Sequence, residues 1–228
     1  MYSFADIFKN KKRVLFVTAH PDDIEVFFSG TVARLRKQKT SCFFQILTSG
    51  SFGKSQDARS QIREKEQLNS LKLVNVPKID VEFCRLKDGF LENNLETIGQ
   101  VVRAIRRRQP EIVCTFDPLN LIIKNKYIMH RDHRHCGQAT IDAVYPYARI
   151  AEFLPQNGKA FSVREILLAD PFSKNTKIDI TREVEMKRKM LLAHQSQWDN
   201  KFIKNVILKD NQSGQKFQEE FAYYQLNL

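Results

Sequence analysis

The sequence has no run of apolar residues that approaches the roughly 20 needed to cross a membrane as a helix. Residues 1–13 also lack the apolar core of a signal peptide, because charged residues soon follow the apolar ones. Cysteine is scarce: the four residues are widely separated and form no CxxC pair, which argues against a disulfide framework or a cysteine zinc site. These absences predict a cytoplasmic protein with reduced cysteines.

Acidic residues are fewer than basic ones, with 26 Asp+Glu against 37 Lys+Arg and a formal net charge of +11. Such an excess suits a nucleic acid, a membrane surface or an anionic substrate, without choosing among them. The densest basic run, residues 103–108, lies in a helical pattern and has no interleaved aromatic residues to stack on bases. We therefore expect a solvated helix face there and no specific nucleic-acid site.

Short apolar runs alternate with amphipathic segments along the 228 residues. The runs predict strands at 14–19, 41–48, 79–84 and 111–116, and helical spacing predicts helices at 24–39, 56–74, 95–107 and 132–145. Further candidates are 164–169, a strand at 177–180 and a helix at 181–195. The alternation predicts an α/β fold, Rossmann-like, with a mostly parallel sheet and helices on both faces. We expect one domain over 1–228, whose tail, 209–228, has no clear pattern.

Four of the five histidines lie in two short segments. Residues 19–23 read Ala-His-Pro-Asp-Asp directly after the first predicted strand, and residues 130–135 read His-Arg-Asp-His-Arg-His after the loop that follows the fourth. Parallel α/β sheets bind ligands at the carboxyl ends of their strands. Each segment could instead be a capped helix start, but two aspartates and a histidine exceed what a cap needs.

The spacing of these residues is typical of a metal site. His20 and Asp23 flank a tight proline turn and can aim at one point, and His133 can supply a third ligand. Two histidines and one carboxylate form a catalytic zinc set that leaves a position open for water. Asp22 would then stand beside that water as a general base, and zinc would lower the pKa of the water toward about 7.

These two segments resemble those of the LmbE-like zinc de-N-acetylases, the superfamily that includes the PIG-L sugar deacetylases. Further motifs follow in the order that the family has them: Leu-Thr-Ser-Gly at 47–50, Arg-Glu-Lys-Glu at 63–66, Asp-Gly at 88–89, Val-Cys-Thr at 113–115 and Ala-His-Gln-Ser-Gln at 193–197. The resemblance therefore covers residues 13–197.

The resemblance implies removal of an N-acetyl group from a GlcNAc-type amino sugar or glycoconjugate, with one Zn²⁺ or another divalent transition metal per chain. Its implied site residues are the ligands His20, Asp23 and His133, the general base Asp22, the oxyanion partner His130, the histidine-orienting Asp132, and the substrate-binding Arg63 and Asp88. The net charge favours a phosphate-bearing sugar conjugate. Assembly into a homo-oligomer is expected by analogy with relatives.

Several alternatives stay open from the sequence alone. The chain could be a non-catalytic glycan- or nucleic-acid-binding protein on the same fold, or an amidase for another acylated amine. Residues 48–55 nearly form a phosphate-binding loop, but Thr48 occupies the first glycine position. His194 could be a structural histidine or a catalytic one. Phe27 and Phe28 stand where small residues are common in the family, which bears on substrate shape.

Overall fold

The computed structural model describes residues 1–52, 57–123, 127–211 and 216–227. Within these ranges seven strands form one sheet in the order β3-β2-β1-β4-β7-β9-β8. The strands are β1 (Arg13–Thr18), β2 (Ser41–Thr48), β3 (Val81–Leu86), β4 (Ile112–Phe116), β7 (Glu165–Ala169), β8 (Thr176–Asp179) and β9 (Gln218–Gln225). The pairings among β1, β2, β3, β4 and β7 are parallel, so the predicted fold class is confirmed.

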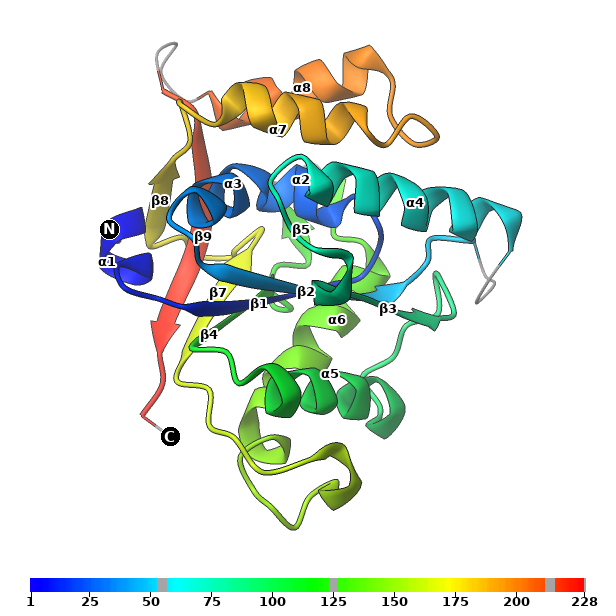
Figure 1. Ribbon diagram of the computed structural model, residues 1–228, viewed down its shortest axis with the longest axis vertical. Coiled ribbons are helices and arrows are strands. Elements are labelled where there is room, and N and C mark those ends of the chain that lie inside the picture. The colour runs from blue at the N-terminus through cyan, green and yellow to red at the C-terminus, as the bar shows by residue number, and fades with distance from the viewer. Residues whose placement is uncertain (53–56, 124–126, 212–215, 228) are drawn as a thin grey trace.

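Helices cover both faces of this sheet (Figure 1). They are α1 (Phe4–Phe8), α2 (Asp23–Phe27), α3 (Ser29–Lys37), α4 (Ala58–Lys72), α5 (Leu95–Arg108), α6 (Arg131–Asp142), α7 (Val184–Leu192) and α8 (Asn200–Asp210). Figure 1 shows α2, α3 and α4 on one face and α5 and α6 on the other, with α7 and α8 as a further layer above α2, α3 and α4. No helix of the described ranges is long and apolar enough to span a membrane.

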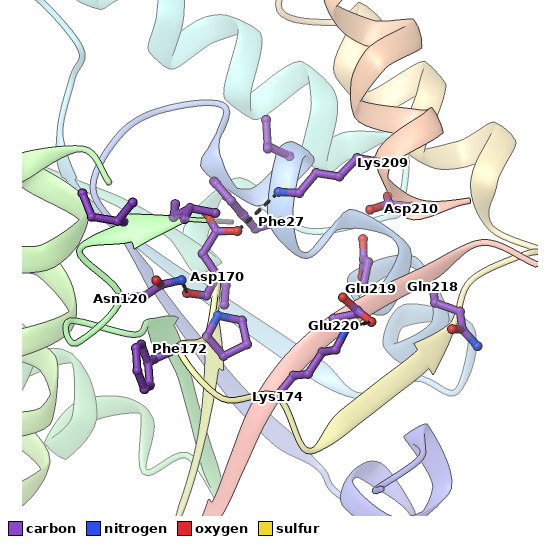
Figure 2. Close-up of a pocket in the computed structure, with 15 residues that line it drawn as sticks. Phe27, Asn120, Asp170, Phe172, Lys174, Lys209, Asp210, Gln218, Glu219 and Glu220 are labelled. Carbon is purple, nitrogen blue, oxygen red and sulfur yellow. Dashed lines mark hydrogen bonds and ion pairs between the residues drawn. The ribbon is translucent and has the colours of Figure 1, made fainter. Parts of the chain in front are cut away.

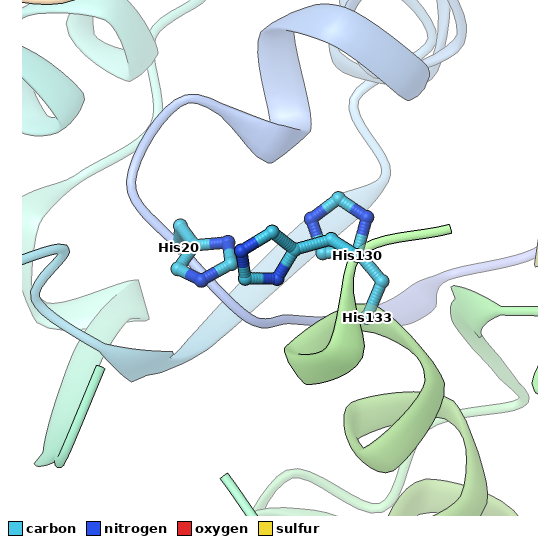
Figure 3. Close-up of side chains that lie close together, drawn as sticks. All are labelled: His20, His130 and His133. Carbon is cyan, nitrogen blue, oxygen red and sulfur yellow. The ribbon is translucent and has the colours of Figure 1, made fainter. Parts of the chain in front are cut away.

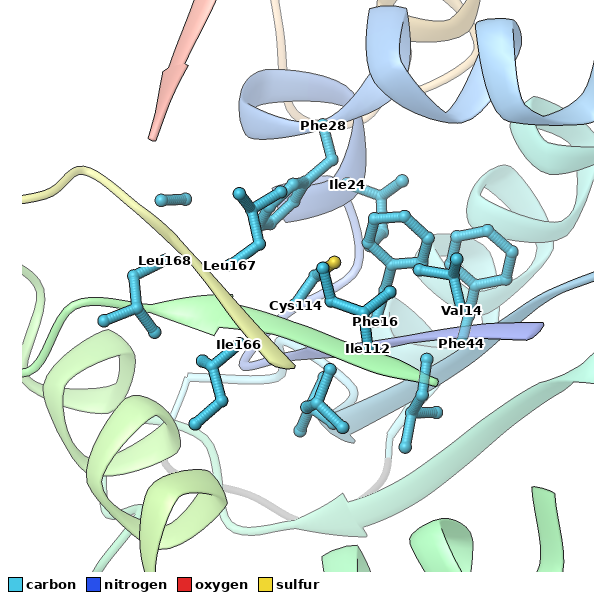
Figure 4. Packing of buried hydrophobic residues seen from close by; sticks show 14 of the residues in the cluster. Val14, Phe16, Ile24, Phe28, Phe44, Ile112, Cys114, Ile166, Leu167 and Leu168 are labelled. Atoms are coloured by element: carbon cyan, nitrogen blue, oxygen red, sulfur yellow. The ribbon is translucent and has the colours of Figure 1, made fainter. Parts of the chain in front are cut away.

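Aromatic side chains organise the core beside β1 (Figure 4). The ring of Phe16 stacks on Phe44 of β2, with centroids 5.2 Å apart, and meets Phe28 edge-on at 5.4 Å. Phe28 in turn stacks on Phe221 of β9 at 5.5 Å. Phe28 has a φ of −130° and separates α2 from α3, so two helices replace the single helix predicted over 24–39. The helix is interrupted at Phe28, whose ring is buried against Phe16 and Phe221 of the sheet.

The C-terminal tail is part of the sheet. Strand β9 pairs antiparallel with both β7 and β8, and Phe221 and Ala222 on it are buried. The predicted loop 117–129 contains a short hairpin of β5 (Ile122–Ile123) and β6 (Tyr127–Ile128). All four cysteines are free, as expected. The near phosphate-loop residues 53–55 lie outside the described residues.

Candidate active site

The two histidine segments meet beyond the carboxyl end of β1, and Figure 3 shows their imidazole rings close together. His20 follows β1, whereas His130 and His133 come from the start of α6. The ring centroid of His20 lies 4.7 Å from that of His130 and 5.3 Å from that of His133. The turn after β1 and the start of α6 therefore place three imidazoles around one point.

Asp23 lies between two of these histidines. Its Oδ2 is 3.6 Å from His20 Nδ1, and its Oδ1 is 3.0 Å from His133 Nε2. Burial alone would raise the pKa of Asp23, but His133 and His20 hold it well below its usual value. An ionised carboxylate and two imidazoles are donors that zinc prefers, so this chain's residues fit a divalent transition metal.

Two further carboxylates fix the far side of His20. Its Nε2 lies 3.1 Å from Asp88 Oδ1 and 3.3 Å from Asp132 Oδ2. Burial would lower the pKa of His20, but hydrogen bonds to Asp132, Asp23 and Asp88 raise it well above its usual value. Because Nε2 contacts these two carboxylates and Nδ1 faces Asp23, Nδ1 is the nitrogen that would bind a metal, as in metal-binding histidines held by an outer carboxylate.

His130 is a competing candidate for the third ligand. Within the described residues, donor atoms of His20, His130 and His133 lie within 4.8 Å of one another, as do those of His20, Asp88 and Asp132. However, His130 caps α6, since its Nδ1 accepts the Asp132 backbone N–H at 3.1 Å. Burial lowers the pKa of His130, helped by His20 and His133. A neutral His130 with Nδ1 as acceptor carries its proton on Nε2 and can donate it.

Asp22 occupies an unusual backbone conformation next to these groups. Its φ of 98° is left-handed, and its Oδ2 accepts a hydrogen bond from Arg63 Nη2 at 3.0 Å. Burial raises the pKa of Asp22 to about 6, although Arg63 works in the opposite direction. A carboxylate with a pKa near neutrality can accept a proton and later return it.

The guanidinium group of Arg63 is held by hydrogen bonds to oxygen atoms of the protein. Its Nη1 donates to Gly50 O at 2.9 Å, and its Nη2 donates to Pro21 O at 2.8 Å as well as to Asp22. Gln67 was not predicted as a site residue, yet its Oε1 accepts the Asp22 backbone N–H at 2.8 Å. The available signal was its position four residues after Arg63, on the same face of α4.

A cavity of about 730 Å³ opens over these groups. Every site residue expected from the sequence lines it except Asp132, which is buried behind His20. The cavity also has aromatic walls: Phe27, which the sequence linked to substrate shape, and Phe52, Phe90, Trp198 and Phe202, which were not predicted. Apolar walls with a few convergent polar groups are typical of small-molecule sites, and aromatic rings suit the C–H faces of a sugar.

Phe27 and its neighbour Val26 line both this cavity and a smaller one of about 330 Å³. Its ring meets Phe116 edge-on at 5.2 Å and His133 edge-on at 5.7 Å. Figure 2 shows Lys209 beside Phe27, reaching toward Asp170, and the Lys209 Nζ to Asp170 Oδ1 distance is 3.3 Å. The bulky residue noted in the sequence therefore forms a wall of the candidate site.

Comparisons with known proteins show which family this chain resembles. The PIG-L family model, described as GlcNAc-PI de-N-acetylase, matches residues 15–144. The chain is 28% identical over 200 residues to diacetylchitobiose deacetylase of Thermococcus kodakarensis, covering 84% of this chain and 72% of the relative. It is 26% identical over 212 residues to a probable N-acetyl-alpha-D-glucosaminyl L-malate deacetylase 2 of Bacillus anthracis, covering 85% and 84%.

Among solved structures, the N,N'-diacetylchitobiose deacetylase from Pyrococcus horikoshii superposes with a TM-score of 0.82 at 25% identity. The superposition covers 96% of this chain and 85% of that one. The family model matches more than half of the sequence, and the similarity in structure extends over nearly all of it. The chain therefore belongs to the PIG-L (LmbE-like) family of metal-dependent deacetylases.

Proposed function

We propose that this protein is a zinc-dependent hydrolase that removes the N-acetyl group from a GlcNAc-type amino sugar. One observation carries the proposal: Asp22, with a pKa of about 6, lines the same cavity as His20, Asp23 and His133. A base beside three convergent metal-type donors is the arrangement that hydrolysis of an amide needs. The names of the relatives, which are deacetylases of acetylated sugars, support the same reaction.

In this proposal His20, Asp23 and His133 hold the zinc ion. Zinc supplies Lewis acidity, which polarises the amide carbonyl and lowers the pKa of a water. Asp88 and Asp132 orient His20 from its other ring nitrogen, because both contact Nε2. Such outer contacts fix the ring and raise its basicity as a ligand.

The side chains around the donors then move protons. Asp22 takes a proton from the attacking water and passes it to the amine nitrogen as the C–N bond breaks, which yields acetate and a free amino sugar. His130 donates its Nε2–H to the oxyanion that forms on the attacked carbonyl. Arg63 keeps the Asp22 carboxylate in place through the 3.0 Å contact.

We further propose that the sugar unit in the cavity is uncharged. Among the described residues that line it, the only lysine or arginine is Arg63, and both of its Nη atoms already donate to protein acceptors. The carboxylates of Asp22 and Asp88 line the same space. Apart from the proposed zinc ion, a phosphate ester would meet these carboxylates with no lysine and no unpaired arginine among the described lining residues, so the net charge of +11 is not concentrated at this site.

Acetate release before and after metal removal tests both proposals. The chelated protein is assayed with N,N'-diacetylchitobiose, N-acetylglucosamine and N-acetylglucosamine 1-phosphate, each with and without one equivalent of Zn²⁺. We expect acetate only after zinc is restored, with a higher kcat/KM for the uncharged sugars. Activity without metal would refute zinc dependence, and preference for the phosphate would refute the uncharged substrate. Failure with every sugar would favour a binding protein or another amidase.

A further inference from the structure

The conformation of Asp22 needs support from outside its own helix. A left-handed φ such as its 98° is uncommon for a residue with a side chain. Asp22 precedes α2 and makes no side-chain capping hydrogen bond to that helix. Strained residues of this kind persist only where surrounding contacts determine their position. The contacts that hold Asp22 are therefore part of how the site is built.

Helix α4 supplies those contacts from one face. Gln67 Oε1 accepts the backbone N–H of Asp22 at 2.8 Å, and Arg63 Nη2 donates to the Asp22 carboxylate at 3.0 Å. The same Arg63 nitrogen donates to Pro21 O at 2.8 Å. Space for the guanidinium comes from Gly50, where an added Cβ would lie 2.0 Å from Arg63 Nη1. The main chain and the carboxylate of Asp22 are thus held by the same helix.

The buried carboxylate of Glu25 fixes the orientation of Gln67. Its Nε2 donates to Glu25 Oε1 at 2.9 Å, and Ser70 Oγ donates to the same oxygen at 2.6 Å. The other oxygen of Glu25 lies 3.2 Å from His194 Nε2. Gln67, Glu25, Ser70 and His194 are all fully buried. Because the amide nitrogen is bound to a carboxylate, the amide oxygen has to face Asp22.

We propose that Gln67 is a positioning residue that, together with Arg63, holds Asp22 in the left-handed conformation in which its carboxylate lines the cavity. The kinetic consequence rests on the proposed function, because it requires Asp22 to act as the base. The hold on the Asp22 backbone rests on the hydrogen bonds alone. This assigns a role in the reaction to a side chain that does not itself line the cavity.

The variant Gln67→Met tests the proposal, because it keeps the length of the side chain and removes the acceptor. Hydrogen–deuterium exchange of the Asp22 amide should accelerate about tenfold or more. In the zinc-loaded enzyme kcat should fall about tenfold or more, while KM and zinc content stay within about twofold of wild type. Gln67→Asn keeps the amide but is too short to reach both partners, so it should have the same effects. It tests the proposal if Gln67→Met does not fold.

Ser70→Ala is the matched control, since it removes a hydrogen bond to the same Glu25 oxygen without a contact to Asp22. It should lower stability but leave kcat and the exchange of the Asp22 amide unchanged. Unchanged exchange or unchanged kcat in both Gln67 variants, or an equal fall of kcat in Ser70→Ala, overturns the proposal. If wild type releases no acetate, the proposed function fails, and the exchange measurement alone then confirms or overturns the hold on Asp22.

Discussion

The region matched by the family model and the region after it use buried charge for different purposes. All eight site residues expected from the sequence lie within residues 15–144, where ionisable side chains converge on an open cavity. The later region contributes β7, β8, β9, α7 and α8, and its buried charges reach back to the first region. The region that holds the candidate site therefore depends on the later region, which fixes the helices packed against it.

Strand β9 illustrates this dependence. Its Glu219 accepts the backbone N–H groups of Gly30 at 2.9 Å and Thr31 at 2.8 Å, so it caps the start of α3. Lys187 of α7 places its Nζ 2.8 Å from Glu219 and 2.9 Å from Asp210. A carboxylate at a helix N-terminus is favourable, and the buried lysine balances its charge.

The largest difference is expected between the effects of replacing His133, in the first region, and His194, in the later region, on bound zinc. His133→Ala should lose both bound zinc and acetate release, because it removes one of three proposed ligands. His194→Gln should keep about one zinc per chain, since His194 pairs with Glu25 and lies outside the donor set. Elemental analysis of the two purified variants checks this. Loss of zinc in His194→Gln but not in His133→Ala would show that the later region, and not the first, holds the metal.

Breaking the ion cluster should mainly affect stability. Lys187→Met leaves Glu219 and Asp210 buried without their cation, so the free energy of unfolding should fall by about 3–5 kcal/mol. Thermal and urea unfolding measure the change. Lys189→Met, at an exposed position on the same helix, should change the free energy by less than about 0.5 kcal/mol. Equal effects in the two variants would contradict the stabilising role of the cluster.

The buried pair of His194 and Glu25 predicts a pH dependence. Burial lowers the pKa of His194, but Glu25 outweighs it and the pKa is raised. A histidine with a raised folded pKa stabilises fully below its unfolded pKa of about 6.5, and the contribution is lost as pH rises through the folded pKa. The stability difference between wild type and His194→Gln, on the order of 1 kcal/mol, should therefore shrink as the pH rises above about 6.5 and through the raised folded pKa of His194.

Urea unfolding of both chelated proteins across that range measures the difference. Chelation removes any contribution from metal binding to the folded state. A difference that grows as pH rises would show that His194 is held neutral and that its pair with Glu25 is not ionic.

The smallest effect is expected where the later region lines the cavity. Trp198 stacks on Phe202 with centroids 3.8 Å apart, and both face the candidate site. Trp198→Ala should raise KM for an acetylated sugar by about three- to tenfold, from the loss of about 0.5–1.5 kcal/mol of aromatic packing, and leave kcat nearly unchanged. Steady-state kinetics test this. A fall in kcat with unchanged KM would assign Trp198 to positioning of the reacting groups instead.

The sequence predicted the parts of the site that depend on neighbours along the chain. His20 and Asp23 share one turn, and His130 and His133 share the start of one helix, so local spacing was informative. The alternation of strands and helices was equally local, and it predicted the parallel part of the sheet correctly.

The remaining features arise from contacts between distant segments. Asp88 and Asp132 meet on His20 Nε2 only after β3 and α6 have packed beside β1, so no spacing indicated that shared contact. Strand β9 lacked a clear pattern because it buries Glu219 among its apolar residues. The cation that balances this carboxylate, Lys187, comes from α7, which periodicity within the strand does not reveal.

The variant Asp22→Asn tests the proposal that Asp22 is the base beside a metal held by other residues. Zinc content and acetate release from N,N'-diacetylchitobiose are measured together in the variant and in wild type. We expect equal zinc in both proteins and a fall in kcat of about 10²–10⁴-fold in the variant. Retained activity, or loss of the zinc along with the activity, would contradict it.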